Sequence, residues 1–221
     1  MDMDSGFAII PNVWTSAQLE AIGHAVHAGS HRSRAGARHL MGEAGVDALA
    51  RDSRMADIAS RVLGTAAIPF RATFFDKSRE ANWLVVWHQD TALPMRRRHD
   101  TPGWGPWSRK AGILYAHAPA SALERVVAIR VHLDDSTADN GPLRVLPGSH
   151  RLGVLTDAAM AELKSRLPAV DCVVPAGGVL LMRPLIVHSS SKSTSAAPRR
   201  VLHIEYAGSL TIEEGVELDV A

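Results

Sequence analysis

The sequence predicts a mainly β fold, either a sandwich or a jelly roll, with helices at its N-terminus. From about residue 66 onward, short strand-forming segments are separated by turns rich in Gly and Pro. The helical patterns precede this β region instead of alternating with its strands, which disfavours a doubly wound parallel sheet. We therefore expect one domain over residues 1–221, with a helical part at 1–65 and a jelly-roll core at 66–206.

The composition limits the classes of partner. The chain has 221 residues, of which 46% are hydrophobic, so one domain can bury a large core. A formal net charge of +1 predicts no general attraction to nucleic acid or to an acidic membrane. No apolar segment approaches the roughly 20 residues of a membrane helix, and the N-terminus lacks the features of a signal peptide. The single cysteine, Cys172, favours a cytoplasmic location. Oligomeric state cannot be read from the sequence.

The first quarter of the chain is expected to be mainly helical after a short strand at 6–11. Thr15 and Gln18 have the spacing of a capping box, and the helix that follows is expected to end near Gly29. A second helical region is predicted at about 46–63, interrupted near Asp52 and ended by Gly64.

The remaining elements follow from alternation and turn signals. Strands are expected at 68–75, 82–87, 126–133, 143–146, 172–174, 179–182, 185–187 and 200–206, and a helix capped by Thr156 is expected at about 157–167. Within 126–133, four apolar residues alternate with Arg130 and His132, so the two sets face opposite sides. The long segment 91–112 contains a basic stretch and a Trp-rich stretch, and we expect it to be an ordered loop over the functional site.

The sequence Trp87-His88-Gln89-Asp90 contains the first candidate metal ligands. His88 and Asp90 are two residues apart on extended backbone, which places both side chains on one face. This pattern alone is common, but it gains weight from His188 at the end of a later predicted strand. Two histidines and one carboxylate form the ligand set of non-haem Fe(II), with open positions for a co-substrate and dioxygen.

An Fe(II) ion held by these three ligands keeps a residual positive charge, which favours a bidentate anionic co-substrate such as 2-oxoglutarate. The far carboxylate of that molecule needs a cation with a matching fork, as arginine provides. Arg199 and Arg200 compete for this role, and adjacent strand residues face opposite ways, so only one can point inward. Ser190 could donate a hydroxyl to the same carboxylate. Lys77 could line the same pocket or be a surface lysine.

Several motifs, in order, resemble the phytanoyl-CoA dioxygenase (PhyH) family of Fe(II)/2-oxoglutarate-dependent oxygenases. They are residues 87–90, 133–135 with 140–150, 176–182, and 188–190 with Arg199, and together they span about 70–206. The resemblance implies a double-stranded β-helix, a cupin-like jelly roll. It also implies that His88, Asp90 and His188 bind iron. The eleven-residue spacing after His188 selects Arg199 as the 2-oxoglutarate residue.

The resemblance also bears on the reaction. The chain is shorter than the acyl-CoA hydroxylases of the family, and residues 1–65 do not resemble them, which argues against a CoA thioester substrate. Halogenating members replace the metal-binding Asp with a small residue, whereas Asp90 is present here, so hydroxylation is expected. The alternative is a non-oxidative cupin-like isomerase or small-molecule binding protein. Such a protein would not need an arginine aimed at a dicarboxylate.

The substrate is expected to be a small molecule with an apolar part, with or without an anionic group. Trp87, Arg97 and Trp104 are the candidate substrate residues, because they lie in or near the segment that follows the metal motif. The basic stretch around Arg97 could equally be a solvated loop, and the tryptophans could equally pack a lid. Three further histidines, His117, His132 and His203, are interpreted as sheet-face residues, and His150 as part of a turn.

Overall fold

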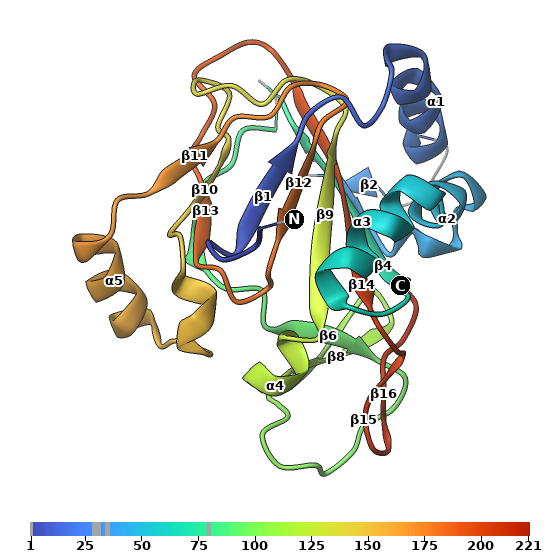
Figure 1. The fold of residues 1–221 in the computed structure, drawn as a ribbon, viewed down its shortest axis with the longest axis vertical. Coiled ribbons are helices and arrows are strands. Elements are labelled where there is room, and N and C mark those ends of the chain that lie inside the picture. The colour runs from blue at the N-terminus through green and yellow to red at the C-terminus, as the bar shows by residue number, and fades with distance from the viewer. Residues whose placement is uncertain (1, 28–31, 34–35, 79–80) are drawn as a thin grey trace.

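Two antiparallel β-sheets packed face to face form the core of the computed structural model (Figure 1), which describes residues 2–27, 32–33, 36–78 and 81–221. The larger sheet has the order β1-β12-β9-β14-β4-β3-β2 and the smaller has the order β11-β10-β13-β5. The strands of the larger sheet are β1 (Phe7–Ile10), β12 (Val179–Met182), β9 (Val126–His132), β14 (Arg199–Ala207), β4 (Ile68–Lys77), β3 (Gly36–Arg38) and β2 (Arg32–Ser33). Those of the smaller sheet are β11 (Val170–Cys172), β10 (Leu143–Val145), β13 (His188–Ser190) and β5 (Val85–His88). The predicted mainly β jelly roll is confirmed.

Three helices, α1 (Ser16–His27), α2 (Ala44–Ala50) and α3 (Ser53–Leu63), lie against the outer face of the larger sheet (Figure 1). The capping box before α1 is confirmed: the Thr15 N–H donates to Gln18 Oε1 at 3.0 Å, and the Gln18 N–H donates to Thr15 Oγ1 at 3.4 Å. The predicted end of α1 near Gly29 lies outside the described residues. Gly64 ends α3 with a φ of +72°, a conformation that glycine adopts without strain.

Alternation along β9 separates the two environments of the larger sheet. Val127, Ile129 and Val131 pack under the helices, whereas Arg130 faces the smaller sheet. His132 has the same parity as Arg130 and is 1% exposed. The sheet therefore presents an apolar face to the helices and a partly polar face to the interior of the jelly roll.

Tyr206 in β14 joins the larger sheet to α2. Its side chain is fully buried, and its hydroxyl donates to the Ala50 carbonyl at 2.9 Å. We expect Tyr206→Phe to lower the free energy of unfolding by about 1–2 kcal/mol, because the Ala50 carbonyl would lose this side-chain partner in a dry environment. Urea denaturation of the two proteins measures this difference, and an unchanged midpoint would contradict it.

Two predicted strands are displaced in the structure. The strand expected at 82–87 begins only at Val85, because Asn82 instead binds the Ser193 backbone through its side-chain oxygen and nitrogen, at 2.7 and 2.8 Å. The strand expected at 185–187 is β13 at His188–Ser190, because the Ile186 N–H closes a turn onto the Arg183 carbonyl. The first strand is shorter than expected and the second keeps its length but lies three residues later, and the two pair with His88 opposite His188.

The segment expected to be one long loop at 91–112 contains two strands, and a third begins directly after it. β6 (Ala92–Met95), β7 (Trp107–Lys110) and β8 (Ile113–His117) form a separate sheet of order β6-β8-β7, followed by α4 (Ala120–Leu123). The segment is ordered, as expected, but much of it packs into a second core cluster with the C-terminal hairpin of β15 (Thr211–Glu213) and β16 (Val216–Glu217). It covers the site only in part.

The helical and jelly-roll parts are not separated cleanly at the predicted boundary near residue 66. β1, β2 and β3 precede residue 66 and join the larger sheet. Beyond residue 206, Ala221 pairs with β4 by donating to the Phe70 carbonyl at 2.8 Å. The remaining helix, α5 (Asp157–Arg166), is capped by Thr156 as predicted and contacts β5. Within the described residues, no helix has the length and apolar character needed to cross a membrane.

Candidate active site

The structure brings His88, Asp90 and His188 together at the ends of two neighbouring strands. His88 closes β5 and lies directly opposite His188 at the start of β13, with 4.2 Å between their ring centroids. Asp90 follows β5 and lies between them: its two carboxylate oxygens are 3.8 Å from His88 Nε2 and 3.6 Å from His188 Nε2. One ligand atom from each residue lies within 4.8 Å of the others, so a single ion could contact all three.

Backbone hydrogen bonds fix the tautomer of both histidines. His88 Nδ1 lies 2.8 Å from the Val86 carbonyl, and His188 Nδ1 lies 2.9 Å from the Ile186 carbonyl. A carbonyl oxygen can only accept, so each Nδ1 carries the hydrogen and each Nε2 keeps a lone pair. Histidines that bind metals usually donate their other ring nitrogen in this way. Both rings therefore present a donor lone pair toward Asp90.

The electrostatics of His188 and Asp90 favour metal-binding protonation states. Burial lowers the pKa of His188 to about 4, so its imidazole is neutral near pH 7. Desolvation would raise the pKa of Asp90, but the surrounding imidazoles and Arg71 outweigh it and hold that pKa well below its usual value. His188 and Asp90 therefore offer one neutral nitrogen donor and one carboxylate without a preceding loss of protons.

Two cavities meet at these residues. The inner cavity, of about 120 Å3, lies between the two sheets, with β4, β9 and β14 on one side and β5, β10 and β13 on the other. The outer cavity, of about 350 Å3, reaches β3, β7 and β8. The two cavities share Arg71, Thr73, Phe75, His88 and Asp90 as walls. A ligand in each cavity would therefore approach the same point.

Arg199 points into the inner cavity with most of its hydrogen-bonding groups unused. It is 3% exposed, its Nη2 lies 3.5 Å from Ser190 Oγ, and its Nε and Nη1 have no partner in the part of the chain that the structure describes. Burial, followed by the charge of Arg130, lowers the pKa of Arg199 to about 9. Leaving a buried guanidinium unpaired is costly, so this geometry fits an absent anionic ligand.

Arg200 faces the opposite side of β14, as the alternation predicts. Its guanidinium forms a bidentate pair with Asp134, with N–O distances of 2.8 and 2.7 Å. Of the two adjacent arginines, the inward one is therefore Arg199.

Lys77 and Ser190 lie beside Arg199. Lys77 is opposite Arg199 in the β4–β14 register, and its Nζ donates to Ser190 Oγ at 2.7 Å and to the Ser191 carbonyl at 2.6 Å. Burial, then Arg199 and Arg130, lower the pKa of Lys77 to about 8. The Ser190 hydroxyl donates to the Gly141 carbonyl at 2.9 Å, so its single hydrogen is committed in this arrangement.

Gly141 is required for this packing. A Cβ at this position would lie 2.4 Å from the Ser191 carbonyl oxygen and 3.1 Å from Lys77 Nζ, and the backbone φ is +70°. Glycine is therefore needed at this position in the 140–142 turn because it lets the loop approach Lys77 closely.

Sequence reasoning missed several polar residues of the inner cavity. Arg71, Arg130 and His203 line it, and Arg130 Nη1 lies 3.2 Å from His203 Nδ1. Arg71 donates to Glu205 Oε1 at 2.6 Å and to the Ala92 carbonyl at 2.8 Å. His203 was interpreted as a sheet-face residue, and its face is the one that forms the cavity. Polar residues two apart in otherwise apolar strands were the available signal.

The candidate substrate residues are not brought to the triad. Trp87 precedes His88 and so faces the other way, against Val187 and Leu146 beneath α5. Arg97 is exposed on the loop after β6. Trp104 is 8% exposed in the second core cluster, where its Nε1 donates to Glu213 at 3.1 Å. None of the three lines the inner or the outer cavity.

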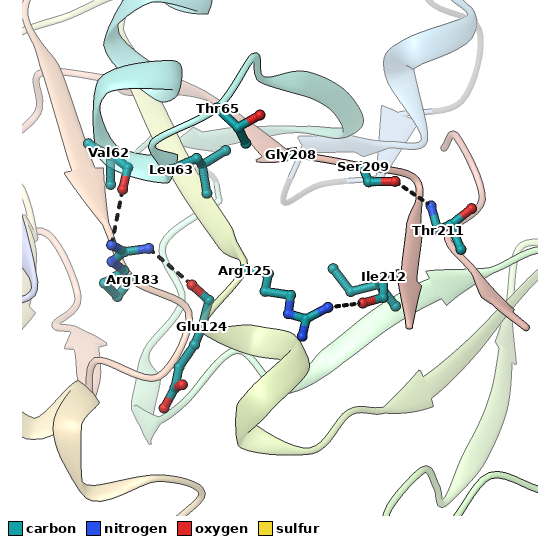
Figure 2. Close-up of a pocket in the computed structure, with 10 residues that line it drawn as sticks. All are labelled: Val62, Leu63, Thr65, Glu124, Arg125, Arg183, Gly208, Ser209, Thr211 and Ile212. Carbon is teal, nitrogen blue, oxygen red and sulfur yellow. Dashed lines mark hydrogen bonds between the residues drawn. The ribbon is translucent and has the colours of Figure 1, made fainter. Parts of the chain in front are cut away.

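Another cavity, of about 360 Å3, lies between α3, α4 and the end of β14 (Figure 2). Arg125 and Arg183 point toward it, but they donate to the backbone carbonyls of Ile212, Glu124 and Val62. It contains none of the predicted site residues, and its arginines are engaged in holding the surrounding segments together.

A sequence profile of the phytanoyl-CoA dioxygenase (PhyH) family matches residues 4–201. The chain belongs to the phytanoyl-CoA dioxygenase family. Among curated proteins, L-proline trans-4-hydroxylase of Streptomyces griseoviridis is 32% identical over 138 residues, covering 51% of this chain and 51% of that protein. Phytanoyl-CoA dioxygenase domain-containing protein 1 of Danio rerio is 34% identical over 94 residues, covering 36% of this chain and 32% of that protein. The matches thus span about half and one third of these relatives.

Solved structures of similar fold extend the comparison of this PhyH-family chain. EctD from S. alaskensis with bound Fe superposes with a TM-score of 0.69 at 21% identity, covering 98% of this chain and 76% of EctD. The epimerase SnoN in complex with Fe3+, alpha ketoglutarate and nogalamycin RO also gives a TM-score of 0.69, at 20% identity over 94% of this chain and 80% of SnoN. At these identities the likeness shows the shared fold.

Proposed function

We propose that this PhyH-family protein is a non-haem Fe(II)/2-oxoglutarate-dependent oxygenase that hydroxylates a small-molecule metabolite. One observation carries the proposal: a buried, unpaired arginine faces the same cavity as a two-histidine, one-carboxylate group. In this assignment His88, Asp90 and His188 hold Fe(II), and Arg199 binds the far carboxylate of 2-oxoglutarate.

The residues present fit both groups. Two neutral Nε2 donors and one carboxylate are the ligand set typical of non-haem Fe(II), and they leave coordination positions for other molecules. Among the described residues, Arg199 Nε and Nη1 have no partner and Nη2 has only the 3.5 Å contact with Ser190 Oγ. Nη2 together with either of the other two nitrogens would supply the two parallel donors that a carboxylate accepts from arginine. Lys77 Nζ, held by Ser190 and Ser191, adds positive charge beside Arg199, although Lys77 is not among the described residues that line the inner cavity.

His88, Asp90 and His188 would hold Fe(II), which when bound would supply dioxygen activation coupled to oxidative decarboxylation of 2-oxoglutarate to succinate and CO2, with one oxygen atom of O2 entering succinate and the other the substrate. The protein contributes binding and orientation. The β5–β13 pairing fixes the two imidazoles, and Arg199 orients the co-substrate from its far end.

The relatives support an oxygenase and make hydroxylation the preferred outcome. The curated relative from Streptomyces griseoviridis is named as an L-proline hydroxylase. Structural neighbours of the same fold include an epimerase and a carbocyclase, so the fold accommodates other oxidative outcomes. The test is succinate formation from 2-oxoglutarate with Fe(II) against a metabolite library, with the product mass recorded for each substrate that responds.

The ligand set predicts hydroxylation instead of halogenation. Asp90 occupies the position that chloride would need at the metal, so products made in chloride buffer should gain one oxygen atom and no chlorine. Mass spectrometry of the product distinguishes the two, and a chlorinated product from the unaltered protein would overturn the assignment. Asp90→Gly opens that position, at the cost of a ligand.

A non-oxidative cupin-like isomerase or binding protein is the second candidate. It shares the jelly roll and the metal ligands but has no need of Arg199. Metal-dependent conversion of a substrate without consumption of 2-oxoglutarate would favour it over the oxygenase.

A further inference from the structure

The outer cavity beside the triad carries an excess of positive charge. Three cationic side chains line it, Arg38 from β3, Arg71 from β4 and Lys110 from β7. Of the described residues that line it, Asp90 alone carries a carboxylate, and the proposed function assigns Asp90 to the metal. Elements distant in sequence thus bring three cations to the mouth of one site.

The three cations differ in how far they are neutralised. Arg71 is paired with Glu205, which is 1% exposed beneath the cavity floor. Among the described residues, Arg38 and Lys110 have no acidic partner within ion-pair distance. Partial burial and the charges of Arg38 and Arg71 lower the pKa of Lys110, as expected for cations that lack a counter-ion.

The walls around these cations are aromatic and held in place. Lys110 Nζ lies 5.1 Å from the centroid of the Tyr115 ring, and the Tyr115 hydroxyl lies 2.8 Å from His39 Nε2. Phe75 lines the shared wall toward the metal ligands. The cavity therefore combines a cationic mouth with apolar surface along the path to the triad.

We propose that the outer cavity is the substrate pocket and that it selects small molecules carrying a carboxylate or phosphate group, which Arg38 and Lys110 bind. Arg71, fixed by Glu205 and the Ala92 carbonyl, faces both cavities and positions the part of the substrate nearest the metal. The inference rests on the proposed function, which supplies the reaction that the bound molecule undergoes.

A binding experiment tests the pocket without turnover. The protein is loaded anaerobically with Ni(II) and saturating 2-oxoglutarate, which occupies Arg199. Two sets of small molecules are then titrated into the protein. The first set pairs each carboxylic acid with its neutral amide, and the second pairs each phosphate monoester with its parent alcohol. Ligand-observed NMR measures the affinity of each compound. We expect acids or phosphate esters to bind at least about tenfold more tightly than their neutral partners.

Matched variants locate the effect. Lys110→Ala and Arg38→Ala should each weaken oxyanion binding about fivefold to thirtyfold, a range reduced from that of a buried charged hydrogen bond because both residues are exposed. Arg109→Ala, on the neighbouring position of β7, and Arg97→Ala, on the exposed loop, should leave the affinity unchanged. The relative response of carboxylates and phosphates identifies which oxyanion the pocket prefers.

Two outcomes overturn the inference. One is a panel in which no oxyanion binds more tightly than its neutral partner. The other is preferential binding that survives loss of both Arg38 and Lys110. Failure of the proposed function gives a different result: the protein would not take up Ni(II) or 2-oxoglutarate in the loading step. The affinities of the acids and phosphate esters for the unaltered protein and for its Arg38 and Lys110 variants could still be measured.

Discussion

Replacing His188 with alanine is expected to remove metal binding and, with it, all turnover. His188 is 4% exposed and supplies one of the three donor atoms that converge at the site. Removing a residue that merely supports a metal ligand typically costs about 10- to 100-fold in metal affinity, so loss of a ligand itself should cost more. His88→Ala and Asp90→Ala should give the same result. Calorimetric titration with Fe(II) under anaerobic conditions measures each affinity.

The matched control is His150→Ala. His150 lies in the short helix η2 (Ser149–Leu152), outside both cavities of the site, and its loss should leave metal stoichiometry at one ion per chain. Circular dichroism establishes that the variants remain folded. Full iron occupancy in folded His188→Ala would exclude His188 from the ligand set and would leave the site without its facial triad.

The metal ligands are the residues that the sequence predicts most directly, because two of them are close together in the chain. His88 and Asp90 are two apart next to a strand, so their common face follows from backbone geometry alone. His188 is distant in sequence and required the family motif to connect it. Strand parity requires that only one of Arg199 and Arg200 point inward, and the spacing in the family motif selects Arg199. In the structure Arg199 is buried and Arg200 pairs with Asp134 on the other face of the strand.

The inner polar residues could not be assigned because the strands that carry them are buried on both faces. All seven residues of β9 are buried, so alternation separates two sets without saying which set faces the cavity. Arg130 can be assigned to the cavity only when it is known that the helices cover the other face of the sheet. The same ambiguity led to His203 being read as an ordinary sheet-face residue.

The candidate substrate residues lie away from the triad because closeness in sequence to the metal motif does not imply closeness in space. Trp104 follows the motif but packs into a cluster with the C-terminal hairpin. The residues that do line the outer cavity include Arg38 and Lys110, from strands on either side of the motif in sequence. No local pattern links such positions before the chain is folded.

Arg199→Ala is expected to weaken 2-oxoglutarate binding by about 30- to several-thousand-fold. Truncating one partner of a buried charged pair typically costs about 2–5 kcal/mol, and Arg199 is buried with two donor nitrogens aimed at no protein group. Lysine keeps the charge but loses the planar fork, so Arg199→Lys should recover only part of the affinity. Metal affinity should change little, because Arg199 lies outside the ligand set.

Arg200→Ala is the internal control for this prediction, since it removes a neighbouring arginine whose guanidinium is bound to Asp134 on the other face of β14. It should cost at most about 1 kcal/mol of stability, as is usual for a partly exposed ion pair, and leave 2-oxoglutarate affinity nearly intact. Anaerobic calorimetry, or the charge-transfer absorption of the iron chelate, measures the affinity of each variant. Loss of binding in Arg200→Ala with retention in Arg199→Ala would reverse the assignment of the two side chains. If neither variant affects binding, the co-substrate does not use this strand, and the non-oxidative cupin-like alternative becomes the better account of the site.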